Sequence, residues 1–256
     1  MASMRRPDSC HRWTALLRTW LRSSEHPDDN EMGRRDHELQ TLAPHKPSPK
    51  SSSSKNEADL RQEIADERRG MGEFLSGLSA DSWEAMTLCD GWRVREVVAH
   101  MTMPFRYSTA QFVYEVIRSR GNFNRMADRC ARRDASISTR ELAACLGENA
   151  TNPWTPPGGG FNGALVHDVV HGLDITVALE VGRKIPQDRM RIVLDALTKP
   201  KTLKYFGTDL DGFELLADDI DWSFGSGSPV SGPAQELALV LCGRKLSPGH
   251  VRGELK

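Results

Sequence analysis

Two histidines stand four residues apart in an otherwise apolar stretch of the chain. The stretch reads GALVHDVVHGLDI and contains His167 and His171, with Asp174 three residues further on. Helical residues four apart lie on one face, so this pair can clamp a divalent metal through its imidazole nitrogens. The pair alone is not decisive, because a chain of 256 residues with eight histidines can contain it by chance. Two hydrogen-bonded histidines in the core or on the surface are the alternative interpretation.

A third histidine strengthens the metal interpretation. His100 lies in DGWRVREVVAHM, a second segment with helical spacing of its apolar residues. If the two helices face one another, three imidazoles converge and leave a coordination position open, as catalytic zinc sites do. Asp174 follows His167 by two helical turns and is predicted to orient a ligand from outside the coordination sphere. A solvent-facing charge near the helix end is the alternative for Asp174.

The elements that must position these side chains are mainly helical. Apolar residues recur at helical spacing over four segments, which predicts four helices and therefore a bundle. Pro104 lies inside the second segment, and Ser138 is predicted to cap the third. The four predicted helices cover residues 57 to about 78, about 92–118, about 138–150 and about 161–181.

A different pattern follows Pro186. QDRMRIVLDAL, residues 187–197, is predicted to be a helix. FELLADDIDWSFGSGSPVSG, residues 213–232, predicts two short strands around a Gly/Ser turn, and PAQELALVLCGR, residues 233–244, predicts a closing helix. The predicted fold is therefore mainly α, a four-helix bundle followed by a small α+β region.

The chain divides into three predicted parts. Residues 1–56 are expected to be a disordered extension, because Ser23–Asn56 holds few apolar residues and includes the low-complexity run KPSPKSSSSK. The extension contains a short basic amphipathic helix at residues 12–22, HRWTALLRTWLR with its flanking histidine. This helix is a candidate for membrane or partner docking, or else packs on its own domain or is translated upstream sequence. The metal-binding bundle is assigned to residues 57–183 and the α+β domain to residues 184–256.

Composition narrows the function classes. The formal net charge of −1 argues against a nucleic-acid partner, and no apolar run of about 18 residues predicts a transmembrane helix. Five scattered cysteines without a CxxC pair fit reduced thiols better than a disulfide framework or a cysteine-based zinc site. A cytoplasmic protein is expected, with membrane contact only through residues 12–22.

Three segments together resemble a known family. They are GWRVREVVAH at residues 91–100, HDVVHGLDI at residues 167–175 and DDIDWSFGSGSPVSGPAQELALVLCGR at residues 218–244. In this order they resemble the mycothiol-dependent maleylpyruvate isomerase family, within the DinB-like four-helix bundles. The resemblance covers about residues 57–246.

The resemblance implies a divalent metal, usually zinc, held by His100, His167 and His171. It also implies mycothiol as a thiol cosubstrate, whose sulfur the metal binds and activates for attack on an electrophilic small molecule. The sequence departs from the family at His167, where the isomerase has glutamate. A neutral ligand there leaves the metal one charge more positive, which favours thiolate binding but puts the isomerase activity itself in doubt. Arg93 departs from the family's Ser or Thr N-cap, unless Asp90 substitutes as the cap.

Further residues receive roles from the resemblance or from their type. Arg244 resembles a catalytic position that turns toward the active site, and capping of helix carbonyls is its alternative role. Trp92 is predicted to bind the cosubstrate as a pocket wall, as is Trp154, with plain core packing as the alternative.

The predicted function is a metal-dependent, mycothiol-dependent S-transferase or isomerase acting on a small electrophile. A first alternative is a non-catalytic, DinB-like metal-binding stress or accessory protein. A second is a metal-free bundle that acts through partners, with the helix at residues 12–22 as its docking element.

Overall fold

The computed structural model describes residues 50–255, and their side chains from residue 56 onward. Over this range the chain is mainly helical with one small sheet, which confirms the predicted fold class. None of the described helices combines the length and apolar character needed to span a membrane. In chain order the elements are α2 (Lys50–Ser76), α3 (Ala80–Glu84), α4 (Val94–Arg106), α5 (Thr109–Arg118), α6 (Phe123–Asp134), α7 (Thr139–Glu148), α8 (Gly160–Ala178), α9 (Gln187–Leu197), α10 (Pro200–Phe206), β1 (Phe213–Ala217), β2 (Ser223–Gly225), β3 (Ser228–Gly232) and α11 (Ala234–Leu241).

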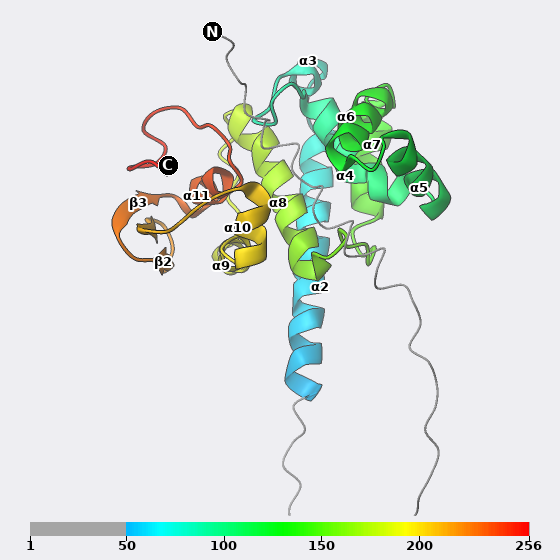
Figure 1. Ribbon diagram of the computed structural model, residues 1–256. Helices are drawn as coiled ribbons and strands as arrows, with labels where there is room; N and C mark the ends of the chain where they lie inside the picture. The colour runs from blue at the N-terminus through cyan, green and yellow to red at the C-terminus, as the bar shows by residue number, and fades with distance from the viewer. Residues whose placement is uncertain (1–49, 256) are drawn as a thin grey trace, which may run out of the picture.

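Helices α2, α4, α7 and α8 form the four-helix bundle (Figure 1). Both α2 and α4 contact α7 and α8. Helices α2 and α7 approach each other closely, because a Cβ added to Gly72 would lie 3.1 Å from the backbone nitrogen of Gly147. Gly72 is therefore a packing residue, because any side chain at this position would push the two helices apart.

Helix α8 lies at the centre of the molecule, between the bundle and the C-terminal region (Figure 1). Every residue from Ala164 to Thr176 is buried. Its Leu165, Val169 and Leu173 pack in a core shared with α9 and α11, whereas Ile175 packs with α4 and α7 in the bundle core. A helix that is apolar all round belongs inside a protein, and this one carries its polar residues into the interior with it.

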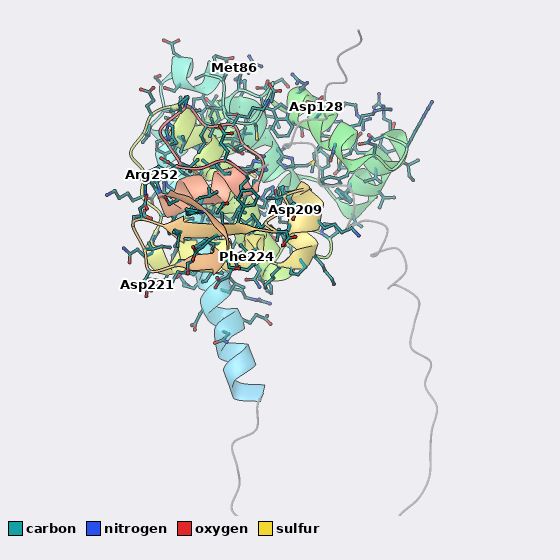
Figure 2. All side chains as sticks on the ribbon, turned by 60° about the vertical axis from the view of Figure 1, so that its left-hand side comes forward. Met86, Asp128, Asp209, Asp221, Phe224 and Arg252 are labelled. Atoms are coloured by element: carbon teal, nitrogen blue, oxygen red, sulfur yellow. The ribbon has the colours of Figure 1, made fainter. Side chains whose placement is uncertain are left out.

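The C-terminal region has three strands, where the sequence analysis expected two. The strand order is β2-β1-β3, with β1 antiparallel to β2 and parallel to β3. The Gly/Ser segment between β2 and β3 crosses from one side of β1 to the other, so that neither strand pairs with the other. Gly227 permits the crossing, since its φ is +130° and a Cβ there would lie 2.1 Å from the Gly212 carbonyl oxygen. Figure 2 brings this sheet forward and marks the exposed Phe224 on β2.

The predicted second helix is two helices. Helix α4 ends at Arg106, two residues after Pro104, and α5 begins at Thr109. Ser108 caps the new helix, because its hydroxyl accepts from the Gln111 N–H and the Gln111 side chain accepts from the Ser108 N–H. Helix α6 follows and packs on α4, although the sequence analysis did not predict it.

The N-terminal boundary also differs from the prediction. Helix α2 begins at Lys50, seven residues before the predicted start at Glu57, and its first turns project from the bundle (Figure 1). The rest of the predicted extension, including the amphipathic helix at residues 12–22, lies outside the described residues. The division between a bundle at residues 57–183 and a domain at residues 184–256 stays a prediction.

Candidate metal centre

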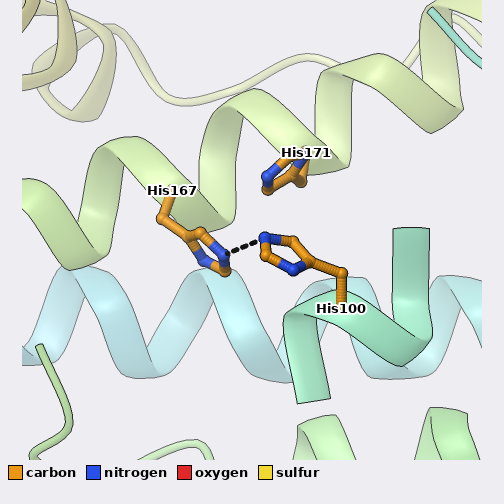
Figure 3. A group of neighbouring side chains, drawn as sticks. All are labelled: His100, His167 and His171. Carbon is orange, nitrogen blue, oxygen red and sulfur yellow. Dashed lines mark hydrogen bonds between the residues drawn. The ribbon is translucent and has the colours of Figure 1, made fainter. Parts of the chain in front are cut away.

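Three buried histidines meet between α4 and α8. His100 comes from α4, and His167 and His171 come from successive turns of α8 (Figure 3). One ring nitrogen of each lies within 4.8 Å of the other two, an arrangement that can hold a metal ion. The side chains are between 2% and 5% exposed, so the cluster is inside the protein. The structure therefore brings together all three residues that the sequence analysis proposed as ligands.

His167 belongs to a buried chain of three residues. Its Nδ1 lies 2.9 Å from Asp168 Oδ1, and Asp168 Oδ2 accepts a 2.7 Å hydrogen bond from Arg68 Nε of α2. Arg68 Nη1 also donates to the Asn152 carbonyl oxygen at 2.8 Å. We call His167, Asp168 and Arg68 the bundle arm.

His171 belongs to a second chain of the same composition. Its Nδ1 lies 3.0 Å from Asp174 Oδ2. Arg244, three residues after the end of α11, donates from Nε to Oδ1 and from Nη2 to Oδ2 of Asp174, each at 2.7 Å. We call His171, Asp174 and Arg244 the C-terminal arm. The Cys89 sulfur also lies 3.0 Å from Asp174 Oδ2, so this arm adjoins the loop before α4.

The electrostatics keep the two carboxylates charged and the imidazoles of His100 and His171 neutral. Burial raises the pKa of Asp174, but the charge and hydrogen bonds of Arg244 outweigh it and lower the pKa to about 2. Burial also raises the pKa of Asp168, but the His167 hydrogen bond and the Arg68 charge outweigh burial, so the pKa is lowered. Burial lowers the pKa of His171 to about 4, against the opposing effect of the hydrogen bond that His171 donates to Asp174. Burial and the neighbouring histidines lower the pKa of His100 well below its ordinary value.

These protonation states suit a metal. An ionised carboxylate only accepts hydrogen bonds, so Nδ1 of His167 and of His171 carries the hydrogen and each Nε2 presents a lone pair. His167 Nε2 lies 3.3 Å from His100 Nε2 (Figure 3). Two nitrogens bound to one tetrahedral zinc at 2.0–2.1 Å lie about 3.3–3.4 Å apart. His100 Nδ1 is buried without a hydrogen-bond partner among the described residues. The ring is therefore held by packing and by the contact of its Nε2 with His167 Nε2.

A cavity of about 370 Å³ leads to this cluster. His100 and His167 line its inner end, together with Trp154 of the loop before α8. The Trp154 and His167 ring centroids are 5.4 Å apart. A small molecule in the cavity therefore reaches two of the three imidazoles.

The structure places the other predicted site residues around the cluster. Trp92 is buried against His100, with ring centroids 5.2 Å apart, and its Nε1 donates to Asp128 Oδ1 at 2.9 Å. Trp92 is not among the residues that line the cavity, whereas Trp154 is. Asp174 is fully buried, which excludes the solvent-facing alternative. The roles of Trp92 in cosubstrate binding and of Arg244 in catalysis stay predictions.

The sequence analysis left open whether Asp90 substitutes as the cap of α4, and the structure shows a contact of Glu96 with the N-cap residue Arg93. The Glu96 carboxylate accepts from the Arg93 N–H at 2.9 Å, and the Arg93 side chain pairs with Glu96 and Glu84. The start of α4 is thus fixed by Glu96, one turn before His100.

The sequence analysis missed Asp168 and Arg68. Asp168 had a signal, since it is a carboxylate next to a candidate ligand in an apolar helix. Arg68 had none, because it lies 100 residues from Asp168 in the chain.

Residues 64–152 match the family model described as the mycothiol maleylpyruvate isomerase N-terminal domain. The resemblance to this family is confirmed. The matched range contains Arg68 and His100 and ends before α8, so His167 and His171 lie beyond it. A search of curated proteins gave no match.

Two solved structures resemble the chain at low identity. One is a crystal structure of the mycothiol-dependent maleylpyruvate isomerase, with 14% identity over 77% of this chain and 91% of the other and a TM-score of 0.40. The second is a histidine-to-alanine mutant of such an isomerase, with 13% identity over 75% of this chain and 89% of the other and a TM-score of 0.41. Both are distant likenesses.

Proposed function

We propose that this protein is a metal-dependent transferase or isomerase that uses a low-molecular-weight thiol, mycothiol, on an electrophilic small molecule. The observation that carries the proposal is the meeting of three histidine nitrogens within 4.8 Å at the inner end of a cavity. The family match supports mycothiol as the thiol. The proposed setting is the cytoplasm, where small thiols are kept reduced.

His100, His167 and His171 would hold the metal, for which zinc is the first choice. When bound, the metal supplies thiol activation, because it lowers the pKa of a coordinated thiol so that thiolate is present near neutral pH. The three ligands are neutral imidazoles and add no negative charge that would oppose an anionic sulfur.

The residues behind the ligands position them. Asp168 and Asp174 accept from Nδ1 of His167 and His171, which fixes each ring and its tautomer. Arg68 and Arg244 hold the two carboxylates in place and keep them ionised. We therefore propose Arg244 as a positioning residue that acts through Asp174, since its guanidinium is bound to that carboxylate.

Both candidate reactions begin with a new carbon–sulfur bond. In a transfer, the leaving group departs with the bonding electron pair and a thiol conjugate remains. In an isomerisation, the thiolate adds to an activated double bond, the former double bond rotates, and the thiolate leaves again with its electron pair.

Metal content is the first test. The full-length chain, reconstituted with zinc and analysed by mass spectrometry, is expected to hold about one ion per chain. His171→Ala should lose most of it. His250→Ala is the matched control, because His250 pairs with Glu236 and stands outside the cluster. Equal zinc in all three proteins would contradict the proposed ligand set.

Thiol chemistry is the second test. Zinc-loaded protein is mixed with mycothiol and chlorodinitrobenzene, and the conjugate is followed by absorbance. Conjugation above background that His171→Ala loses and His250→Ala keeps would support the enzyme. Zinc binding without conjugation across a panel of electrophiles would favour the metal-binding accessory protein. Absence of zinc binding would favour a metal-free bundle that acts through partners.

A further inference from the structure

The walls of the cavity are aromatic and apolar. They come from the end of α4, the start of α5, the start of α6 and the loop before α8. Apart from the two histidines, the largest lining side chains are Met103, Tyr107, Phe112, Phe123 and Trp154. Phe112 and Phe123 face each other across α5 and α6, with ring centroids 6.3 Å apart. The cavity therefore offers flat, apolar surfaces to a bound molecule.

The cavity wall lacks charged side chains. Among the described residues that line it there is no Lys, Arg, Asp or Glu, and the polar groups belong to histidines, a tyrosine, a tryptophan and hydroxyl side chains. At about 370 Å³ the cavity is at the lower end of ligand sites. A carboxylate placed here would lose its water without gaining a cation from the wall.

Arginines do lie behind the wall, but carboxylates hold them. The guanidinium carbons of Arg106 and Arg133 are each 5.6 Å from the Tyr107 ring centroid. Arg106 pairs with Asp134 at 2.8 Å, and Arg133 pairs with Asp134 and Glu115. The Tyr107 hydroxyl donates to Asp134 as well, at 2.7 Å, so it is also turned into this network. Neither arginine is available to a ligand without breaking a partly buried ion pair.

We infer that the cavity selects a neutral aromatic or alicyclic molecule of one or two rings and discriminates against carboxylates. This inference rests on the proposed function in one respect, namely that the selected molecule is the electrophile. It predicts that maleylpyruvate is not the substrate, because a keto acid with two carboxylates would find no counter-charge among the described lining residues.

A metal held by His100, His167 and His171 would supply a positive charge that none of the described lining side chains of the cavity offers. A thiol bound to this metal removes that opportunity for an anion. The selection is therefore expected in the complex of protein, zinc and thiol, where the electrophile contacts the cavity walls and the bound thiol.

The test compares two unreactive probes that differ in charge. Binding of naphthylmethanol and of naphthoate to the full-length, zinc-loaded protein is measured by calorimetry with saturating mycothiol present. Naphthylmethanol is expected to bind at least about tenfold more tightly, because the carboxylate loses hydration without a partner. Equal or tighter binding of naphthoate, or binding of neither probe, would overturn the inference.

A pair of variants tests whether the wall is responsible. Thr109 lines the cavity and Ala110 does not, although both lie in the first turn of α5 and are exposed. Thr109→Arg is expected to raise the affinity for naphthoate about tenfold by supplying the missing cation. Ala110→Arg adds the same charge to the same helix end and should change the affinity for naphthoate by less than about twofold. Equal responses of the two variants would contradict the assignment of selectivity to the cavity.

The outcomes separate this inference from the proposed function. If the neutral probe is preferred but no thiol conjugate forms with any electrophile, the cavity selects as inferred and the proposed function fails. If anionic electrophiles react as fast as neutral ones of the same reactivity, the proposed function holds and the inference fails.

Discussion

The two arms behind the histidine cluster contain the same residue types but are anchored in different parts of the fold. In the bundle arm, Asp168 is adjacent to His167 and its arginine comes from α2. In the C-terminal arm, Asp174 is one turn beyond His171 and its arginine follows α11. The cluster therefore depends on both sides of α8, since each side supplies the cation for one carboxylate.

The arms also differ in how the cation is bound. Arg244 forms two parallel hydrogen bonds with Asp174, each 2.7 Å long. Arg68 contacts Asp168 through Nε alone, and its Nη1 donates to the Asn152 carbonyl oxygen. Its Nη2 is buried without a hydrogen-bond partner among the described residues. The arginine of the C-terminal arm therefore has more of its hydrogen-bond donors paired than the arginine of the bundle arm. The C-terminal arm is also the one that joins the bundle to the C-terminal region.

The largest expected effect comes from removing either cation. Arg68→Met and Arg244→Met each leave a buried carboxylate unpaired, which should lower the free energy of unfolding by about 3–5 kcal/mol. Denaturant titration of the full-length protein measures it. Arg252→Met is the control, because the Arg252–Asp218 pair is exposed and its loss should change stability by less than about 1 kcal/mol. If both buried variants match this control, the arms do not stabilise the fold.

Lowering the pH should destabilise the metal-free protein by protonating His171 of the C-terminal arm. The pKa of His171 is about 4 in the folded state and 6.5 ordinarily. The neutral ring is therefore favoured by folding, so stability is full above pH 6.5 and falls as the pH drops from 6.5 to 4. The loss is on the order of 3 kcal/mol. Thermal unfolding at a series of pH values in the presence of chelator should show a smaller loss in His171→Gln; an identical loss would sink this assignment.

The carboxylates should tune metal affinity. Asp168→Asn and Asp174→Asn keep the shape of the side chain but weaken its hold on the imidazole, and each should reduce zinc affinity about 10–100-fold. Competition with a chromophoric chelator measures the affinity. Asp218→Asn, at an exposed pair, is expected to bind zinc like the parent. An effect in one arm only would show that the other histidine is oriented by packing.

The smallest effect distinguishes the two ways in which the arginines bind. Arg244→Lys replaces a two-bond contact by a single charge and should cost about 1–2 kcal/mol of stability. Arg68→Lys retains one contact with Asp168 and should cost about 1 kcal/mol or less. Denaturant midpoints of the two variants provide the comparison, and the reverse order would refute the assignment of the stronger contact to Arg244.

The sequence predicted best where a local pattern was sufficient. Residues 187–197 form α9 as predicted, because the apolar spacing is clear and Pro186 precedes it. Ser138 caps α7 as predicted, with its hydroxyl accepting from the Glu141 N–H. Both signals act within a few residues, so no tertiary contact was needed to read them.

Prediction failed where two local signals competed. The apolar pattern runs on past Pro104, but the capping pair Ser108 and Gln111 starts a new helix within it. Helix α6 was missed although Phe123, Met126 and Cys130 are buried at helical spacing, because arginines occupy much of the intervening sequence. The site shows the same limit, since helical spacing pointed to the histidines but Arg68 is brought to Asp168 only by the packing of α2 on α8.

The distance in sequence between Asp174 and Arg244, 70 residues, has a consequence for the newly made protein. When a ribosome has synthesised α8, all members of the bundle arm already exist in the nascent chain, but Asp174 still lacks its cation. The bundle arm can therefore assemble first, and His171 gains its fixed orientation only after Arg244 has been added. Translation thus fixes the order in which the residues of the two arms become available, and the C-terminal arm is the second.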